Sequence, residues 1–393
     1  MALDQGAAIS ELIRRIRRSA PGDLAPVVAE IAADADLSAA IVYLVDYGQV
    51  RLVPLPYRGM PSRLPLGVEG TLAGRAYRTG VVQTSDAPPD GTRLWLPLVE
   101  GAERLGVLEV TLPVGVESTR VDAEHFAAAV ATLLSTRWQY GDVFELVRRQ
   151  RRMRLPAEIQ WRLLPPTTVR TDHVALAALL EPWDEVGGDT FDYALNDGRL
   201  QVALFDAMGH GLSAALLATL AVGAYRHSRR GRADLEETYE AVDEAIADQF
   251  GRTQFVTGLL LDLDVATGSL RWVTAGHVPP LLLRHDKMVR MPPARPATPL
   301  GLGFTPGPPP VQHLQLEPGD RLVLYTDGVV EARRHGQFFS DERLADFVVR
   351  ATASGHVGPE VLRRLIKAVL EHQDGVLQDD ATIVLLEWGG QPG

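Results

Sequence analysis

Four strand-like apolar runs in the second half of the chain each carry an aspartate at one end. These aspartates are Asp189, Asp206, Asp327 and Asp379. Residues 202–206 and 321–327 show the pattern most clearly, because an apolar run leads to the acid. If the strands share a sheet edge, the carboxylates converge, and two bare carboxylates about 5 Å apart repel by roughly 3 kcal/mol at an effective dielectric constant near 20. The constellation therefore requires a cation between its members.

The expected cation is a metal ion held by oxygen ligands. No lysine or arginine stands beside the acids in these motifs, and the chain has no cysteine. Thiolate zinc sites, disulfides and cysteine nucleophiles are thereby excluded. His210 and His277 lack the matching ligands that a zinc site needs. Magnesium or manganese, which suit carboxylate, carbonyl and water ligands, are the predicted ions.

The length and composition indicate two domains joined by a connector. The chain has 393 residues, of which 46% are hydrophobic and 23% are charged, so each half can bury a core. The longest apolar stretches, such as residues 214–225, are shorter than the ~18 to 20 residues that cross a bilayer, and the N-terminus has no apolar signal region. We therefore expect a cytoplasmic protein without a membrane partner. A net charge of -11 argues against broad nucleic-acid binding.

The N-terminal part has the pattern of a compact α+β domain. Helical spacing of apolar residues predicts helices, and apolar runs between turn signals predict strands. The predicted helices cover residues 4–18, 25–33 and 122–138, and the predicted strands cover residues 40–45, 50–55, 93–98 and 105–112. A hairpin is expected through residues 100–103.

Three motifs in this domain carry a family resemblance. Residues 67–80 (GVEGTLAGRAYRTG), 94–98 (LWLPL) and 105–108 (LGVL) resemble a GAF sensory domain, and the resemblance covers about residues 20–138. It implies a pocket for a small ligand or a dimerising surface, although no cysteine exists to attach a bilin. Tyr57, Tyr77 and Trp95 are expected to pack in the core rather than to contact a ligand.

Residues 139–166 are predicted to form a helical, coiled-coil-like linker. Their candidate seam positions are Val143, Leu146, Val147, Met153, Ile159 and Leu163. Such a seam can pair with its twin, so we expect a homodimer. Pro156 divides the segment and Pro165 ends it. The arginines between residues 148 and 154 are interpreted as a solvated helix face rather than as a nucleic-acid patch.

The four aspartate motifs, in their order, resemble those of PPM (type 2C) protein phosphatases in the bacterial sporulation-protein-E branch. The match runs from about residue 167 to 388 and includes residues 275–280 (AGHVPP), 299–301 (PLG) and 316–320 (LEPGD). Residues 157–166 (AEIQWRLLPP) also resemble the segment that precedes this domain. Thr190 is a departure from the usual pattern, but no metal-ligand position is lost. The resemblance implies an α-β-β-α sandwich, with two packed antiparallel sheets between helices, over residues 167–393.

The resemblance also implies roles for individual residues. Asp206 would bridge two metal ions, Asp327 and Asp379 would complete one of them, and Asp189 with the Ala207 carbonyl would serve the other. Two adjacent cations can lower the pKa of a water, orient a phosphoryl group and stabilise its charge, so no protein nucleophile is needed. The general acid is not identified, and water and His210 are candidates. Asp380 and Thr382 are expected to position the loop, and His277 to satisfy backbone groups in a turn.

Members of this branch act on phosphoserine or phosphothreonine of anti-anti-sigma factors, so such a protein is the implied partner and substrate. Two other interpretations stay open. Residues 187–191 (GGDTF) resemble the diguanylate cyclase signature, but Thr190 occupies the place of its acidic residue. A catalytically silent sensor or scaffold would keep the fold and bind a partner; intact ligand positions argue against it. Each aspartate taken alone is also explained by turn chemistry, because aspartate beside glycine shapes loops.

Overall fold

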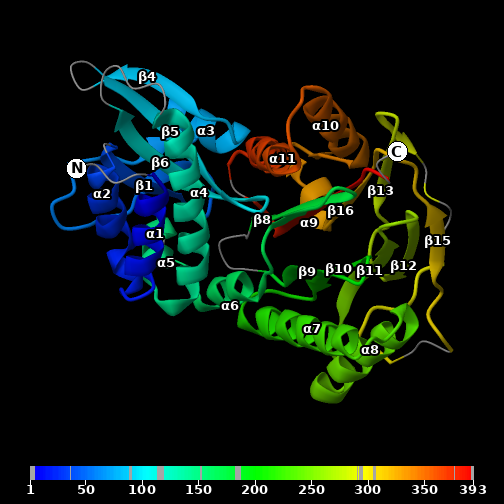
Figure 1. Cartoon of the computed structure of the whole chain (residues 1–393). Coiled ribbons are helices and arrows are strands. Elements are labelled where there is room, and N and C mark those ends of the chain that lie inside the picture. The colour runs from blue at the N-terminus through cyan, green and yellow to red at the C-terminus, as the bar shows by residue number, and fades with distance from the viewer. Residues whose placement is uncertain are drawn as a thin grey trace. The chain divides into compact units, whose positions relative to one another are not determined.

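The computed structural model describes residues 5–35, 37–87, 91–112, 119–150, 153–181, 187–289, 291, 295–303, 307–375 and 377–390. The chain divides into two compact units, Met1–Arg152 and Met153–Gly393 (Figure 1). Within the described ranges no helix is both long enough and apolar enough to span a membrane.

The first unit is built on one antiparallel sheet with the strand order β3-β2-β1-β6-β5-β4. Its strands are β1 (Ser38–Val45), β2 (Arg51–Pro54), β3 (Leu66–Gly67), β4 (Gln83–Ala87), β5 (Gly91–Glu100) and β6 (Glu103–Leu112). Its helices are α1 (Gln5–Ile16), α2 (Leu24–Asp34), α3 (Leu72–Thr79), α4 (Thr119–Arg137) and α5 (Val143–Arg148), with 3-10 turns at Pro21–Asp23 and Trp138–Tyr140. The hairpin predicted through residues 100–103 joins β5 to β6.

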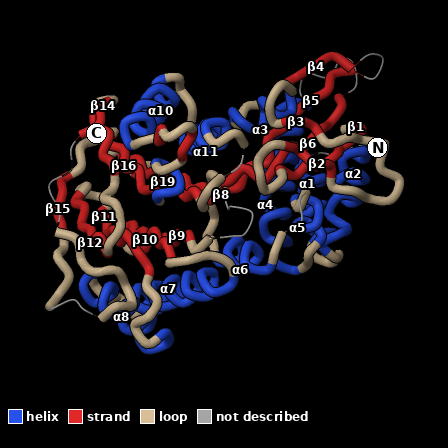
Figure 2. Tube along the Cα trace, turned by 180° about the vertical axis from the view of Figure 1, so that it is seen from behind, coloured by secondary structure: helices blue, strands red, loops and turns tan. Residues whose placement is uncertain are grey.

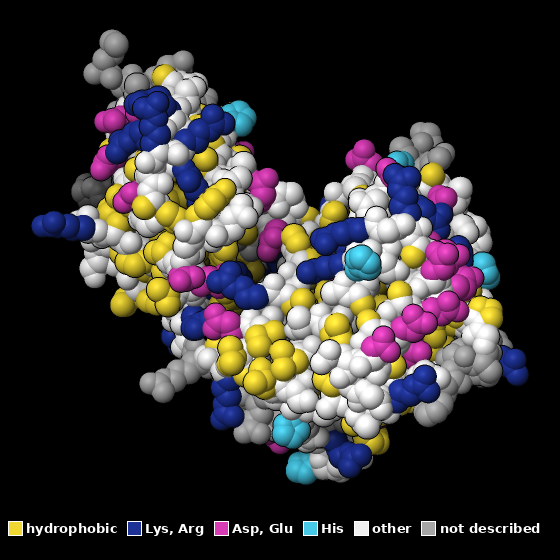
Figure 3. All heavy atoms as spheres, turned by 90° about the horizontal axis from the view of Figure 1, so that it is seen from below, with side chains coloured by type: hydrophobic (Ala, Val, Ile, Leu, Met, Phe, Trp, Pro, Cys, Tyr) yellow, Lys and Arg dark blue, Asp and Glu magenta, His cyan; other side chains and the backbone are white. Residues whose placement is uncertain are grey.

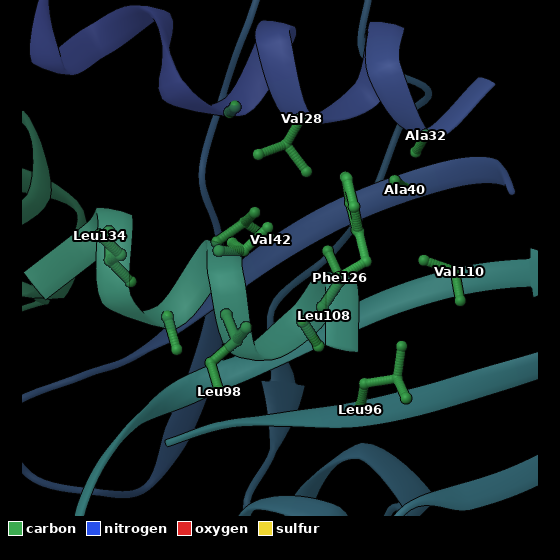
Figure 4. Close-up of a cluster of buried hydrophobic side chains, with 14 of the residues drawn as sticks. Val28, Ala32, Ala40, Val42, Leu96, Leu98, Leu108, Val110, Phe126 and Leu134 are labelled. Atoms are coloured by element: carbon green, nitrogen blue, oxygen red, sulfur yellow. The ribbon is translucent and has the colours of Figure 1, made fainter. Parts of the chain in front are cut away.

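The two faces of this sheet bury different cores, because side chains along a strand alternate between the faces. Val42 of β1 faces a core shared with α1, α2 and α4, in which Phe126 of α4 is buried against the strands (Figure 4). Tyr43 faces the other core, beneath α3, where its ring contacts Trp95 edge to face. Tyr77 lies in the same core. The expectation that Trp95 and Tyr77 serve core packing is confirmed, while the GAF identity of the unit stays a prediction.

The second unit contains two antiparallel sheets with the orders β15-β12-β11-β10-β9 and β14-β13-β16-β19-β8-β7. The strands of the first are β9 (Asp189–Asn196), β10 (Arg199–Ala207), β11 (Val256–Asp264), β12 (Ser269–Ala275) and β15 (Gln312–Gln315). Those of the second are β7 (Thr168–Arg170), β8 (Val174–Glu181), β13 (Leu281–Arg284), β14 (Lys287–Val289), β16 (Asp320–Tyr325) and β19 (Ala381–Trp388). A short ribbon pairs β17 (Arg333–Arg334) with β18 (Gln337–Phe338).

Helices cover the outer face of each sheet and complete the predicted α-β-β-α sandwich (Figure 2). They are α6 (Leu155–Leu163), α7 (Leu212–Arg230), α8 (Leu235–Phe250), α9 (Asp327–Val330), α10 (Asp341–Ala353) and α11 (Gly358–His372). Residues 202–205 of β10 form an apolar run because both faces of the strand are buried there. Val202 and Leu204 enter the core between the sheets, while Ala203 and Phe205 enter the core under α7 and α8. A strand buried on both faces needs a continuous apolar run.

Helix α8 shows how a sequence pattern divides core from surface. Tyr239, Val242 and Ile246 are buried against the sheet. The exposed acids on this helix recur every three or four residues, and they are Glu237, Glu240, Glu244 and Asp248. Figure 3, which is seen from the side of α7 and α8, shows acidic side chains gathered on this part of the second unit. The spacing matches one turn of helix, so the stripe is the solvent face of an amphipathic helix.

Residues 139–166 were predicted to form a helical linker. The structure corrects this prediction, because the segment contains short helices that belong to different units. The backbone leaves the helical region at Gly141 (φ 178°, ψ 170°) and again at Arg149 (φ -78°, ψ 87°). Helix α5 packs into the first unit, where Phe144 is fully buried. Pro156 lies in the first turn of α6, where its missing N–H is not needed.

The expectation of a solvated arginine face is also wrong for Arg148. Its Nε donates to the Val45 carbonyl at 2.8 Å, and its guanidinium lies 4.5 Å and 5.1 Å from the ring centres of Tyr47 and Trp138. This arginine therefore fastens the end of α5 to the sheet of the first unit. Arg151 and Arg152 lie outside the described residues.

Candidate active site

The four predicted aspartates come from two strand pairs in the two sheets of the second unit. Asp206 near the end of β10 and Asp189 at the start of β9 are direct partners in the strand register. Asp327 begins α9 just after β16, and Asp379 lies just before β19, the strand that pairs with β16. Strands β9 and β19 are in contact across the sandwich. The strand ends that the sequence singled out therefore meet at one place in the fold.

Hydroxyl groups from the second sheet hold the Asp189 carboxylate. Thr326 Oγ1 and Thr382 Oγ1 both donate to Asp189 Oδ2, at 2.6 Å and 2.7 Å, and the side chain is almost fully buried. Burial raises the pKa of Asp189 well above its usual value, and the charges of Asp206 and Asp380 raise it further. Since two hydroxyls donate to the carboxylate, the protein fixes its orientation.

Asp206 and Asp379 share the electrostatic environment of this cluster. Burial raises the pKa of Asp206 to about 7, and the nearby charges of Asp327 and Asp379 add to the shift. The pKa of Asp379 is raised by burial and by Asp327 and Asp380, although the Asp380 N–H, which donates to Asp379 Oδ1 at 2.9 Å, opposes the shift. Asp327 and Asp379 are exposed. The cluster therefore has a buried end at Asp189 and an end open to solvent.

Glycines allow the chain segments to approach one another at this cluster. A Cβ on Gly188 would lie 2.3 Å from the Ala207 carbonyl oxygen, and one on Gly187 would lie 2.6 Å from Asp380 Oδ2. Both distances are too short for any side chain. The glycine pair in the sequence motif therefore serves the close approach of the Asp189 turn to Ala207 and Asp380.

The donor set fits a hard divalent cation, although the carboxylates are not gathered around one point. Within the described residues no three Asp, Glu or His side chains form a group that could hold a metal ion. Bare carboxylates repel one another, so a closed ligand set is expected only around a cation. The raised pKa values of Asp189, Asp206 and Asp379 show the same unrelieved repulsion and burial. Oxygen donors of this kind suit magnesium or manganese.

His277 connects this cluster to the neighbouring strand. Its Nε2 lies 3.1 Å from the Tyr325 carbonyl and therefore donates, so that in the neutral ring Nδ1 accepts from Thr257 Oγ1 at 3.0 Å. Burial lowers the pKa of His277, which favours this neutral ring. Thr257 Oγ1 also lies 3.4 Å from Asp206 Oδ2. The expected backbone role of His277 is confirmed, and its second contact reaches the neighbour of Asp206.

Sequence reasoning missed three residues that bind members of the cluster. Thr257 and Thr326 were not singled out, and Gln160 was noted only as part of a motif. Gln160 donates to both Asp189 and Asp380. Thr382 and Asp380, predicted to position the loop, do contact Asp189 and Gly187. His210 is exposed in the turn after Asp206.

Asp192 on β9 lies outside this cluster. It is almost fully buried, and it binds Arg226 at 2.7 Å and Arg229 at 2.8 Å. Removing one partner of such a buried ion pair destabilises a fold by about 3–5 kcal/mol. Asp192 is therefore a structural residue and would be a poor control for changes in the cluster.

Comparisons with known proteins show which family and which relatives the second unit is similar to. Residues 196–389 match the family described as Stage II sporulation protein E (SpoIIE). The chain is 22% identical over 233 residues to Phosphoserine phosphatase RsbU of Bacillus subtilis, covering 59% of this chain and 68% of RsbU. It is 25% identical over 259 residues to Protein IcfG of Synechocystis sp., covering 58% of this chain but only 40% of IcfG.

A solved structure supports the fold of the second unit. The crystal structure of the RsbU and RsbW domains of Rv1364c from Mycobacterium tuberculosis matches with a TM-score of 0.50 and 27% sequence identity. The match covers 57% of this chain and 63% of that one. It identifies the fold of the C-terminal half, whereas the first unit is a mixed α/β domain of unassigned type.

Proposed function

Because the C-terminal half of the chain is a SpoIIE-family domain with the PP2C-type phosphatase fold, we propose that the protein is a metal-dependent protein serine/threonine phosphatase. One observation carries the proposal. Aspartates from four strand ends in two sheets share one electrostatic environment, in which burial and mutual repulsion raise the pKa values of Asp189, Asp206 and Asp379. Neighbouring carboxylates with perturbed pKa values are typical of functional sites.

The residues of the cluster have separate tasks in this proposal. Asp206, Asp327, Asp379 and Asp189, with the Ala207 carbonyl, would hold two divalent ions, manganese or magnesium. Asp206 would serve both ions, Asp327 and Asp379 would serve one, and Asp189 with Ala207 would serve the other. Bound cations supply a water of lowered pKa and charge stabilisation for phosphoryl transfer. Thr326 and Thr382 keep Asp189 oriented. Water or His210, exposed in the turn after Asp206, supplies the proton to the serine oxygen.

The surroundings of Asp206 suit a protein substrate. Met208, Leu212 and Leu216 are large apolar side chains with exposed fractions of 40%, 45% and 50%. Leu212 and Leu216 lie one helical turn apart at the start of α7, so they share a face. Exposed apolar side chains beside a polar site are typical of protein interfaces. The substrate we propose is an anti-anti-sigma factor phosphorylated on serine or threonine, the class that the family resemblance implies. The name Phosphoserine phosphatase RsbU agrees with phosphoserine as the group that is hydrolysed.

The full-length protein is expected to release inorganic phosphate from a serine-phosphorylated anti-anti-sigma protein when manganese is present. Asp327 and Asp379 are exposed, so this end of the cluster is accessible from solvent. The same protein phosphorylated on tyrosine instead of serine is the comparison, and its hydrolysis should be much slower. Phosphate release is measured by a colorimetric assay. Binding of the phosphoprotein without release would instead support the silent scaffold.

The first unit is proposed to act as a GAF-like sensor that binds a small ligand and supports a homodimer. Its end, α5, is fastened by Arg148 and Phe144 to the first unit, while α6 packs against α7 and β9 of the second. The backbone between α5 and α6 spans only residues 149–154. A connection this short can transmit a change in one unit to the other, as a shift between competent and incompetent states.

Leu146→Asp is expected to change the manganese concentration that gives the half-maximal rate by about fivefold or more, as allosteric coupling of ordinary strength would. Leu146 is 67% exposed on α5, so the change is made on the surface of the first unit and not in its core. A chain beginning at Met153, which keeps α6, should show a similar shift. Leu64→Asp, at a leucine that is 78% exposed in the first unit, is the matched control. Identical manganese titrations for the wild type, both substituted proteins and the shortened chain would show that the first unit does not affect the metal requirement. Its proposed role would then be limited to recruitment of the protein to a partner.

A further inference from the structure

Gln160 of α6 reaches into the carboxylate cluster. Its side chain is 1% exposed, and its Nε2 donates to the Asp189 carbonyl and, at 3.1 Å, to Asp380 Oδ2. Both partners are acceptors, so the amide nitrogen has to face them and the orientation of the amide is fixed. The amide oxygen has no hydrogen-bond partner among the described residues. Within the described residues, the hydrogen bonds of this side chain therefore run through Nε2 to the cluster.

The two partners of Gln160 belong to segments that are far apart in sequence. Asp380 follows Asp379 directly, and its Oδ1 accepts from the Gly187 N–H at 3.1 Å. Gly187 is two residues before Asp189. The Asp380 carboxylate thus accepts from the turn before β9 with one oxygen and from Gln160 with the other. Gln160 donates to Asp189 and to Asp380, and Asp380 accepts from Gly187. These three hydrogen bonds connect α6 with both turns in a closed loop.

A second attachment holds α6 at its C-terminal end. Arg226 of α7 donates from Nη2 to the Leu163 carbonyl at 2.7 Å, and the same nitrogen binds Asp192 Oδ1 at 2.7 Å. Asp192 and Asp189 are both on β9. The helix is therefore tied to β9 at two points three residues apart on each element, through Gln160 and through Leu163. Such a double attachment sets the position of the Gln160 amide along the strand.

From these contacts we propose that Gln160 is a positioning residue that holds the turn of Asp189 against the turn of Asp379 and Asp380. The proposal rests on the proposed function, because the distance between these turns matters only if Asp189 and Asp379 serve a common pair of cations. An amide that donates to the Asp380 carboxylate also offsets part of the negative charge of that carboxylate. Without the amide, the turns lose their link and the ligand set closes less readily around metal.

Gln160→Met is expected to weaken manganese binding by about tenfold, since a hydrogen bond to a charged group is worth about a factor of ten or more. Methionine keeps the approximate volume and removes the donors. The readout is a manganese binding isotherm of the full-length protein, followed by electron paramagnetic resonance of free Mn²⁺. Gln315→Met is the control. Gln315 is the last residue of β15, the strand at the opposite edge of the sheet from β9, and it donates to the Thr267 and Leu316 carbonyls.

A double-mutant cycle with Asp380→Asn separates positioning from a general loss of stability. If Gln160 acts in part through Asp380, Gln160→Met should weaken manganese binding less in the Asp380→Asn background than in the wild type, because only the bond to the Asp189 carbonyl is then left to lose. Gln160→Asn, one methylene shorter, replaces the methionine variant if that variant does not fold.

Equal manganese affinity in wild type and Gln160→Met would overturn the positioning role while leaving the proposed function intact. An undiminished effect of Gln160→Met in the Asp380→Asn background would also contradict it. A wild-type protein that binds no manganese would contradict the proposed function itself, and the role of Gln160 with it.

Discussion

Asp206→Asn is expected to lower the rate of phosphate release by about a thousandfold or more. The amide lacks the charge with which Asp206 would hold both cations, and metal-ion catalysis contributes several kcal/mol of transition-state stabilisation, of which each 1.36 kcal/mol is tenfold in rate. Initial rates are measured with a serine-phosphorylated protein over a range of manganese concentrations. A rate near that of the wild type at low manganese would show that Asp206 is not the shared ligand.

The same variant should be more stable than the wild type when metal is absent. Burial and the charges of Asp327 and Asp379 raise the pKa of Asp206 to about 7, above the usual value near 3.9. A raised folded-state pKa means that the stabilisation is complete below about pH 4 and is lost as the pH rises to about 7, by up to about 4 kcal/mol. Asparagine carries no charge and escapes this loss. Thermal unfolding in a chelator should therefore give a higher Tm for Asp206→Asn than for wild type at pH 8, and a smaller difference at pH 4.

Asp248→Asn is the matched control for this change. Asp248 is exposed on the acidic face of α8, so the substitution removes the same charge without touching the cluster. It should leave both the rate and the Tm close to wild type, because surface substitutions usually change stability by less than about 0.5 kcal/mol. Asp192→Asn cannot serve this purpose, since Asp192 is buried between Arg226 and Arg229.

Removal of divalent cations is expected to stop phosphate release entirely and reversibly. The cluster offers oxygen donors, and without a cation Asp189, Asp206 and Asp379 repel one another. The cores of the second unit are apolar and contain none of these aspartates, so the fold should survive chelation. Rates are measured after treatment with a chelator, after its removal by dialysis, and after addition of manganese or magnesium. Release that continued after exhaustive chelation would rule out the two-metal reaction.

The sequence located the aspartates of the cluster because one residue type marks each strand end, while their roles stay a prediction. Asp206 and Asp327 follow apolar strands that are buried on both faces, and these strands can be recognised from local composition. The meeting of the four strand ends followed from the family resemblance and from the repulsion argument, and the register of Asp206 with Asp189 agrees with it.

The residues that support the site could not be predicted in this way. The bond from Gln160 to Asp380 joins positions 220 residues apart, and the bonds from Thr326 and Thr382 to Asp189 also depend on how the two sheets pack. A pattern within one segment carries no signal for such contacts. The structure of residues 139–166 could not be predicted for a related reason. Helical spacing of apolar residues does not reveal that Phe144 is buried in the core of the first unit instead of in a seam between two chains.

Counting the bound manganese ions tests the central claim most directly. Full-length wild type and Asp206→Asn are equilibrated with the same free manganese concentration, and the bound ions per chain are determined by dialysis and metal analysis. The account predicts two ions per chain for the wild type at saturation and a marked loss of binding in Asp206→Asn. Two ions bound equally by both proteins, or wild-type hydrolysis of a phosphoserine protein with no ion bound, would contradict it.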